Sequence, residues 1–341
     1  MHAMNIILMD QKRHAGILCL FFLFFLVTIA ITPLIGSIQI DLEKAFSKDL
    51  AFNDNVDANI LFLARIPRII LAALTGAALS IAGAVLQSLL RNDLAAPFTL
   101  GVSSGAALGA VIAMSLGLPH AILGIPTVPI AAFLGALGAI TLVFSLARTR
   151  TGEFPTSVLL LAGVTANFFF AALVMLIHYL SDFTQSFRIV RWLMGGLDIT
   201  SYKTLISISP MIFIGFGILM FFSRDLNIIS TGLQSAMSRG VEVIKIQKIG
   251  FIMASLLTGA VVALSGPIGF VGLIVPHIVR LMVGPDLRIL LPASMFFGAS
   301  FLILCDTLAR IIIAPTEIPV GIITAMLGGP FFVWLLKRPK T

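Results

Sequence analysis

The sequence predicts an all-α membrane protein whose helices cross the bilayer about ten times. Of its 341 residues, 59% are hydrophobic and 11% are charged. A soluble domain of this composition would expose one continuous apolar patch. Apolar runs of about 18 residues or more recur along the chain, as expected of helices that cross a hydrocarbon layer about 30 Å thick. The alternating pattern of an outer-membrane barrel strand is not visible.

Ten apolar runs lie between polar breaks, and together they predict a single transmembrane permease domain over residues 1–341. No connection between them is long enough to fold as a separate soluble domain. The eighth run is short and contains Pro276. The expected spans are residues 14–36, 65–88, 94–117, 122–147, 156–180, 203–223, 247–265, 270–284, 289–309 and 318–336.

The boundaries of the first three spans follow from local chemistry. The first run is too long for the apolar core of a signal peptide and lacks a small-x-small cleavage site. The second ends at the polar triplet Arg91-Asn92-Asp93. Pro97 is expected to start the third span, because the missing N–H of a proline costs little in the first turn of a helix. Within that span Gly101, Gly105 and Gly109 are spaced by four, which predicts close packing against another helix.

The distribution of basic residues predicts the orientation. An even number of spans puts both termini on one side of the membrane. If that side is the cytoplasm, fourteen Lys and Arg side chains face inward and eight face outward, in agreement with the positive-inside rule. We therefore expect both termini in the cytoplasm. Arg65 and Arg68 lie together at the outer start of one span and require a separate explanation.

Two stretches indicate an inverted repeat. Residues 75–83 (TGAALSIAG) resemble residues 258–266 (TGAVVALSG). The first stretch would run inward and the second outward. Inverted repeats are a common construction in transport proteins whose pathway lies between the two halves.

No motif on the chain predicts catalysis, a metal site or a bound cofactor. The string from Gly101 to Gly105 matches the Gly-x-Ser-x-Gly of a hydrolase, but no strand precedes it. Zinc-protease and phosphate-loop motifs do not occur. Ionisable residues are nearly missing from the spans, apart from Asp306 and Arg310, which lie one helical turn apart and can pair. The energy for uphill transport is therefore expected from a partner.

Several strings, in order along the chain, resemble the permease subunit of the FecCD/BtuC-type ABC importers, which move ferric siderophores, haem or cobalamin. The resemblance extends from the first span to the C-terminus and implies a BtuC-like (type II importer) bundle of ten spans. The strings are RIPR at 65–68, GAAL at 76–79, GAVLQ at 83–87, RNDLAAP at 91–97, LGVSSGA at 100–106, GPIGFVGLIVPH at 266–277 and EIPVG at 317–321.

The resemblance implies three kinds of protein partner, in addition to membrane lipid. Two permease subunits, either two copies or two homologues, would form the pathway in membrane lipid. Two ATPase subunits would hold the ATP and Mg, so this chain would bind no cofactor. A periplasmic or lipid-anchored substrate-binding protein would deliver the cargo, and no nucleic acid is expected.

The resemblance also assigns a docking role to Arg65, Arg68 and Arg310 at the outer mouth. Positive charge there would steer a negatively charged partner and set its register. The alternative is that these arginines extend their charged ends to lipid headgroups.

The cytoplasmic loop between spans six and seven is expected to contact the ATPase. The acidic pair that commonly follows the first glycine in the family is replaced here by Leu233 and Gln234. Leu233 and Met237, at i and i+4, would be the apolar residues that enter an ATPase groove; the alternative is a solvated loop helix. The residues matched to this loop are Gly232, Leu233, Ala236, Met237, Arg239 and Gly240.

At the inner end of the pathway the resemblance places Asn92 and Leu94, with Thr156 and Ser157 at the start of span five. Small polar residues in a pathway suit a large cargo that is passed along and not held tightly. Each of these residues could equally be an ordinary turn or N-cap residue.

The sequence thus predicts an inner-membrane permease subunit for a metal chelate, with a ferric siderophore as the expected cargo. Haem and cobalamin are alternative cargoes within the same family. A secondary transporter driven by an ion gradient is a second class of function, and it would need carboxylates within the membrane or an ion site at a broken helix.

Overall fold

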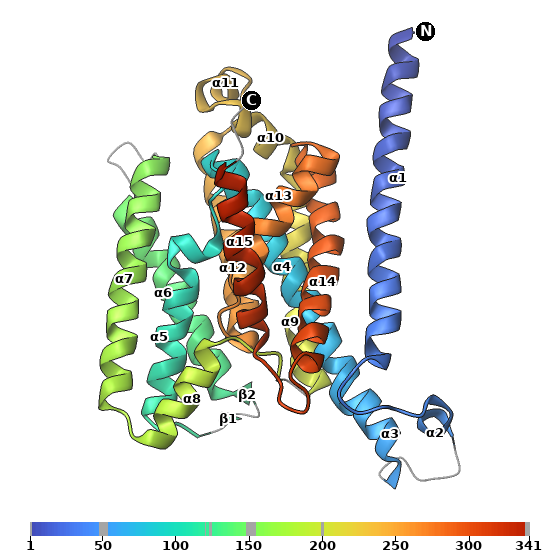
Figure 1. Cartoon of the computed structure of the whole chain (residues 1–341). Coiled ribbons are helices and arrows are strands. Elements are labelled where there is room, and N and C mark those ends of the chain that lie inside the picture. Colours follow the sequence, from blue (N-terminus) through green and yellow to red (C-terminus); the bar gives the residue numbers. More distant parts are fainter. Residues whose placement is uncertain are drawn as a thin grey trace.

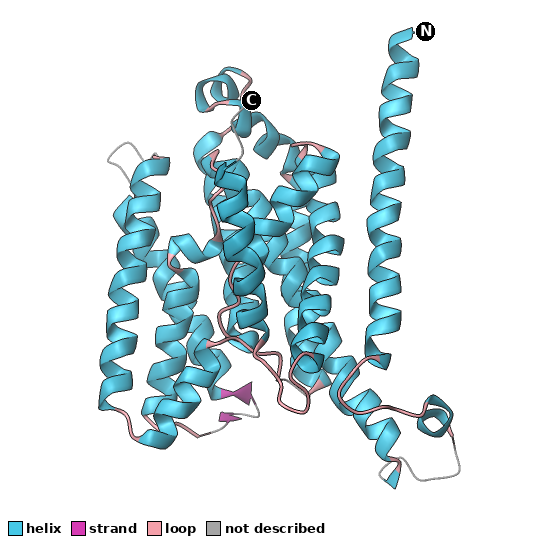
Figure 2. Cartoon of the chain, in the orientation of Figure 1, coloured by secondary structure: helices cyan, strands magenta, loops and turns pink. Residues whose placement is uncertain are grey.

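The computed structural model describes residues 2–47, 54–119, 121–122, 125–147, 155–198 and 201–337. Over these ranges the chain is almost wholly helical (Figure 2). One small hairpin, β1 (Ala121–Ile122) paired antiparallel with β2 (Ile125–Pro126), precedes a long helix. The all-α membrane fold expected from the composition is therefore confirmed.

Each of the ten predicted ranges overlaps a long or medium helix. Among the described residues, seven helical stretches are long and apolar enough to cross a membrane, whereas α5, α13 and α15 are shorter apolar helices. The ten helices are α1 (His2–Ile31), α4 (Ile66–Leu90), α5 (Val102–Ser115), α6 (Thr127–Ala147), α7 (Thr156–Leu180), α9 (Tyr202–Phe221), α12 (Val243–Ser265), α13 (Val271–Val283), α14 (Leu287–Ile311) and α15 (Val320–Lys337).

Short helical segments connect these helices. They are η1 (Thr32–Leu34), α2 (Leu42–Phe46), α3 (Val56–Asn59), the π-helical segment η3 (Ile60–Arg65), η4 (Pro97–Leu100), α8 (Phe183–Leu193), α10 (Ser223–Thr231) and α11 (Leu233–Ser238). We call the end that carries α10 and α11 the α11 end, and the end that carries α2, α3 and α8 the α8 end. α1 starts and α15 finishes at the α11 end (Figure 1).

The third predicted span begins later than expected. α4 ends at Leu90, and the next residue, Arg91, has a left-handed backbone (φ 47°) and donates its N–H to the Gln87 and Ser88 carbonyls. Pro97 begins the 3-10 segment η4 and not the membrane helix, because Gly101 adopts φ 78° and separates η4 from α5. That backbone region favours glycine. α5 therefore starts at Val102, eight residues after the predicted boundary.

α4 lies at the centre of the bundle and packs against α12, α13 and α14. Glycine permits the close approach in two places. A Cβ on Gly76 would lie 2.1 Å from the Gly298 carbonyl oxygen of α14, and a Cβ on Gly83 would lie 1.8 Å from the Gly272 carbonyl oxygen of α13. Backbone-to-backbone contact of this kind provides van der Waals packing where both the helices and the lipid are apolar.

The predicted glycine row divides between two contacts. A Cβ on Gly105 would meet Ala139 at 2.4 Å, and a Cβ on Gly109 would meet the Ala131 carbonyl oxygen at 2.1 Å. Both glycines therefore lie where α5 packs closely on α6. Gly101 lies outside that seam and faces α7 near Ala166. The whole Gly-x-Ser-x-Gly string lies at the start of α5, with no strand before it in the described chain.

The two similar stretches lie in α4 and α12, which pack against each other. α4 runs from the α8 end to the α11 end, and α12 runs in the opposite direction (Figure 1). This antiparallel arrangement is the one that an inverted repeat requires.

Candidate docking, coupling and pathway sites

A cluster of three arginines and two carboxylates lies at the α8 end, where α4 and α14 meet. Arg68 is in the first turn of α4, and Asp306 and Arg310 are in the last turns of α14. The Arg68 Nε donates to Asp306 Oδ1 at 2.9 Å and to Oδ2 at 3.1 Å, and Arg310 Nε lies 3.2 Å from Asp306 Oδ2. One buried carboxylate therefore serves two guanidinium groups.

Arg65 and Arg310 also donate to the backbone that follows α1. Arg65 Nη1 donates to the Pro33 carbonyl oxygen at 2.7 Å and its Nη2 donates to the Ile38 carbonyl oxygen. Arg310 Nη1 donates to the Ile35 carbonyl oxygen at 3.3 Å. The two residues are only 6% and 5% exposed, so their charged ends bind protein and do not extend toward lipid headgroups.

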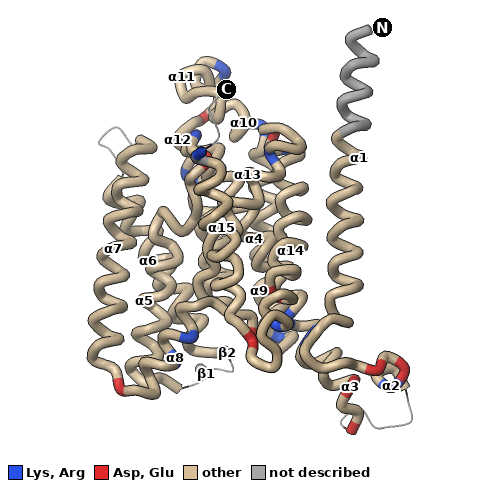
Figure 3. The backbone as a smooth tube through the Cα atoms, in the orientation of Figure 1, with Lys and Arg blue, Asp and Glu red and all other residues tan. Residues whose placement is uncertain are grey.

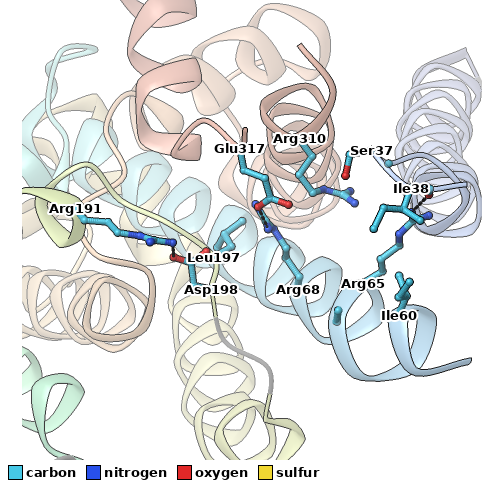
Figure 4. A pocket seen from close by; sticks show the side chains of 12 residues that line it. Ser37, Ile38, Ile60, Arg65, Arg68, Arg191, Leu197, Asp198, Arg310 and Glu317 are labelled. Carbon is cyan, nitrogen blue, oxygen red and sulfur yellow. Dashed lines mark hydrogen bonds and ion pairs between the residues drawn. The ribbon is translucent and has the colours of Figure 1, made fainter. Parts of the chain in front are cut away.

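Glu317 completes the cluster from the connection between α14 and α15. Its Oε2 lies 2.5 Å from Arg68 Nη1. The Glu317 side chain is 44% exposed, whereas that of Arg68 is 15% exposed. Figure 4 shows Glu317 in contact with Arg68, while Arg310 points toward Ser37 and Ile38, and all of these residues line one pocket of about 420 Å³. The charged side chains that line this pocket are Arg65, Arg68, Arg191, Asp198, Arg310 and Glu317.

The structure thus brings together the three arginines predicted at this mouth and adds partners that sequence reasoning missed. The pairing of Asp306 with Arg310 follows from their i, i+4 spacing. Arg68 finds Asp306 at a sequence separation of 238 residues, and Glu317 at a separation of 249. An exposed second pair, Arg191 with Asp198 at 3.4 Å, borders the same pocket. Only the folded chain reveals these long-range contacts.

The loop predicted to meet an ATPase is formed by two short helices at the α11 end. Gly232 separates α10 from α11 with φ 143°. Ala236 is buried, and Leu233 packs partly against the core. Met237 and Arg239 are exposed, and Gly240 ends the loop with φ 79°. Met237 lies at the edge of a largely apolar groove of about 630 Å³ formed with residues 241–245, 248 and 249.

A hydrogen-bonded joint connects α10 to the start of α14. Asn227 Nδ2 donates to Asp286 Oδ1 at 2.6 Å, and Asn227 Oδ1 accepts from the Leu287 N–H at 2.8 Å. Burial acts to raise the pKa of Asp286, but hydrogen bonds from Arg288 and Asn227 outweigh it and lower that pKa to about 2. The Asp286 carboxylate is therefore ionised at any physiological pH, and its hydrogen bond with Asn227 does not depend on protonation of Asp286.

Of the four predicted pathway residues, Asn92 and Leu94 lie in the turn between α4 and η4, and the other two lie at the start of α7. Asn92 Oδ1 accepts from the Leu94 N–H at 2.9 Å and so shapes the turn after α4. Leu94 is exposed, and Thr156 and Ser157 begin α7. The segment between α4 and α5 contacts α7 closely through η4. A Cβ on Gly163 of α7 would lie 2.7 Å from the Thr99 carbonyl oxygen of η4.

An ion pair that the sequence did not predict holds the same turn. Asp93 pairs with Arg280 in the last turn of α13. Arg280 Nη2 also donates to Gln87 Oε1 at 3.1 Å. The turn between α4 and η4 is therefore attached to α13 by a charged contact.

Comparison with known proteins matches the chain to the FecCD transport family over residues 22–338. The chain is 42% identical to the cobalamin import system permease protein BtuC of Halobacterium salinarum, over 87% of this chain and 78% of that protein. It is 40% identical to the hemin transport system permease protein HmuU of Yersinia pestis, over 81% and 82% of the two chains.

The fold has a close counterpart among solved structures. It matches an inward-facing conformation of a metal-chelate type ABC transporter with a TM-score of 0.83 and 32% sequence identity. The match covers 94% of this chain and 99% of the other. The resemblance stated from the sequence strings is confirmed by these comparisons.

Proposed function

The chain belongs to the FecCD transport family and is a permease subunit of an ABC importer, and from this premise we propose that it moves a metal chelate inward across the inner membrane. ATP hydrolysis on two partner ATPases drives the movement, and this chain binds no cofactor of its own. The observation that carries the proposal is the family match over residues 22–338. A ferric siderophore is the first cargo to test, with haem and cobalamin as alternatives, since relatives are named for both.

The charge distribution supports a cytoplasmic α11 end. Lys and Arg occur at both ends of the described bundle, whereas most of the acidic residues lie at the α8 end (Figure 3). Counted over the whole sequence, fourteen Lys and Arg lie on the side of the termini and eight on the other side. The positive-inside rule then places both termini in the cytoplasm and the arginine cluster on the outer face. The Lys and Arg residues of the described chain at the α11 end are Arg91, Arg224, Arg239, Lys245, Lys248, Arg280, Arg288 and Lys337.

On the outer face, the arginine cluster is the docking site for an acidic surface of a substrate-binding protein. The cluster of Arg65, Arg68 and Arg310 with Asp306 and Glu317 retains a net positive charge, which attracts a negatively charged partner. Arg65 and Arg310 hold the backbone after α1 and so shape the mouth. Arg68, the most exposed of the three arginines, makes the direct contact.

On the inner face, α10 and α11 receive the ATPase. Met237 is exposed beside an apolar groove whose rim carries Lys245 and Lys248. An apolar residue beside a groove suits the insertion of one helix into a partner surface. Asn227 and Asp286 then transmit movement of α10 to α14, because the two side chains bond these helices directly.

A second permease subunit, either another copy or a homologue, completes the pathway. α7 exposes several large apolar side chains along its length, including Leu161, Phe168, Met175 and Tyr179. Such a face needs lipid or another subunit to cover it. Asn92, Leu94, Thr156 and Ser157 line the inner end of the pathway in this arrangement.

The test is uptake by the purified complex in proteoliposomes. The tagged chain is recovered from its native membranes in mild detergent and its companions are identified by mass spectrometry. The proposal is supported if an ATPase is recovered in the same molar amount as this chain, and if the complex takes up a labelled chelate only when ATP is supplied. Uptake that persists with a catalytically inactive ATPase, or with an ion gradient alone, contradicts it.

A further inference from the structure

Two carboxylates occupy the guanidinium group of Arg68, and they differ sharply in access to solvent. Asp306 takes the Nε and Nη2 side, with Nη2–Oδ1 at 2.9 Å, and is buried. Glu317 takes Nη1 at 2.5 Å and is 44% exposed. A ligand that arrives from outside can therefore reach the Glu317 position at Arg68, whereas Asp306 is out of its reach.

Glu317 lies where its release would affect the bundle. It is in the connection between α14 and α15, and the next residue, Ile318, donates its N–H to the Ala309 carbonyl oxygen at 3.1 Å. α15 begins at Val320, and its second residue, Gly321, packs so closely that a Cβ there would lie 2.2 Å from the Met194 carbonyl oxygen. The position of this connection thus bears on the start of α15.

The Glu317 carboxylate also determines how strongly the mouth attracts anions. With Glu317 in place, the cluster of Arg65, Arg68 and Arg310 is offset by two negative charges. Without it, only Asp306 remains, and the net charge of the cluster rises by one. Glu317 and Arg68 line two adjoining pockets, of about 420 and 480 Å³. The change in net charge would therefore alter the electrostatic potential in both pockets.

We propose that Glu317 is an internal substitute for the carboxylate of the docking partner. It occupies Arg68 Nη1 in the free permease, and an acidic side chain of the substrate-binding protein displaces it on docking. The displacement frees the connection of residues 312–319 and the first turn of α15. This inference rests on the proposed docking function. It adds that Glu317 competes with the binding protein for Arg68, which lowers the affinity of the permease for that protein. It also adds that docking changes the conformation at the start of α15.

Hydrogen–deuterium exchange on the purified permease complex, without any binding protein, tests the first half of the inference. Glu317→Ala is expected to speed exchange in peptides that cover residues 312–322 by about threefold or more, since local opening follows the loss of a tether. Glu43→Gln, which removes an exposed carboxylate of α2 at the same end, is the matched control. Unchanged exchange in Glu317→Ala overturns the inference whether or not docking occurs at Arg68.

Binding of the substrate-binding protein recovered with the complex tests the second half. Glu317→Gln is expected to lower the Kd of the permease for the binding protein by about fivefold. The substitution removes a partly exposed ion pair that competes with the binding protein for Arg68. Arg68→Gln should weaken it by about tenfold or more. If Arg68→Gln weakens binding but Glu317→Gln does not tighten it, docking stands and the substitute role of Glu317 is wrong. If Arg68→Gln leaves binding unchanged, the docking proposal itself is wrong.

Discussion

Arg68 on α4 and Asp306 on α14 form an ion pair between residues that are 238 positions apart in the sequence. Arg68 Nε lies 2.9 Å from one oxygen of the Asp306 carboxylate and 3.1 Å from the other. The pair closes the α8 end of two helices that touch backbone to backbone at Gly76 and Gly298. At its other end α14 is bonded to α10 through Asp286 and Asn227. α14 therefore connects the proposed docking mouth with the proposed ATPase contact.

Removing the charge of Asp306 should strongly destabilise the fold. Asp306→Asn leaves Arg68 and Arg310 without their shared buried counter-charge, and breaking a buried ion pair typically costs about 3–5 kcal/mol. We expect a large drop in the free energy of unfolding measured in mixed micelles. Glu242→Gln, which breaks the exposed pair with Lys245, should change it by less than about 1 kcal/mol. Equal effects of the two substitutions would contradict the burial of the cluster.

The seam between α5 and α6 should not accept one extra methyl group. In Gly109→Ala the new Cβ would lie 2.1 Å from the Ala131 carbonyl oxygen, and overpacking of this kind costs about 1–3 kcal/mol. Gly138→Ala on α6 is the control, since its Cβ would meet no described atom within 4 Å. We expect Gly109→Ala alone to lower the midpoint of thermal unfolding, followed by size-exclusion chromatography after heating.

The joint between α10 and α14 should be insensitive to pH in the native chain. The pKa of Asp286 is about 2 in the folded chain and about 4 in the unfolded chain. The ionised carboxylate therefore stabilises the fold fully at any pH above the unfolded pKa, and this stabilisation is lost only as the pH falls toward 2. The midpoint of thermal unfolding should therefore show no contribution from this group between pH 8 and 5.

Asn227→Asp should make the same joint sensitive to pH. The substitution places a second carboxylate beside Asp286, and two carboxylates in contact cannot both ionise without a large penalty. The variant should be less stable than Asn227→Ala at pH 8, and the difference should narrow as the pH falls to 5. A difference that does not change with pH would mean that the two side chains separate.

A charge at Met237 should release the ATPase. Met237→Glu places a carboxylate at the edge of the apolar groove of α11 and α12, where a desolvated charge opposes association. We expect recovery of the ATPase in a pull-down to fall by about tenfold, as for an interface residue worth more than 1 kcal/mol. Gln234→Glu adds the same charge to an exposed position of the same helix and should retain the ATPase. Equal recovery with both variants would place the contact elsewhere.

The order of the helices could be predicted from hydropathy alone, because each helix must shield its backbone from lipid within its own length. The third span shows the limit of this argument. Residues 94–101 are as apolar as a helix requires, but η4 and the left-handed Gly101 occupy them. The contact of η4 with Gly163 of α7, which is distant in sequence, accompanies this conformation.

The sequence by itself determined that this chain is a bundle of membrane helices, and that Gly105, Gly109 and the pair Asp306–Arg310 lie on helix faces. These features depend on composition and on spacing of three or four residues, which a helix converts directly into geometry. Only the tertiary structure decided which of the three arginines at the proposed docking mouth remains accessible to a partner. Arg65 and Arg310 are held by carbonyl groups after α1, and Arg68 is shared between Asp306 and Glu317. Those partners come from segments far apart in the chain, and a charged side chain takes its role from the groups that surround it.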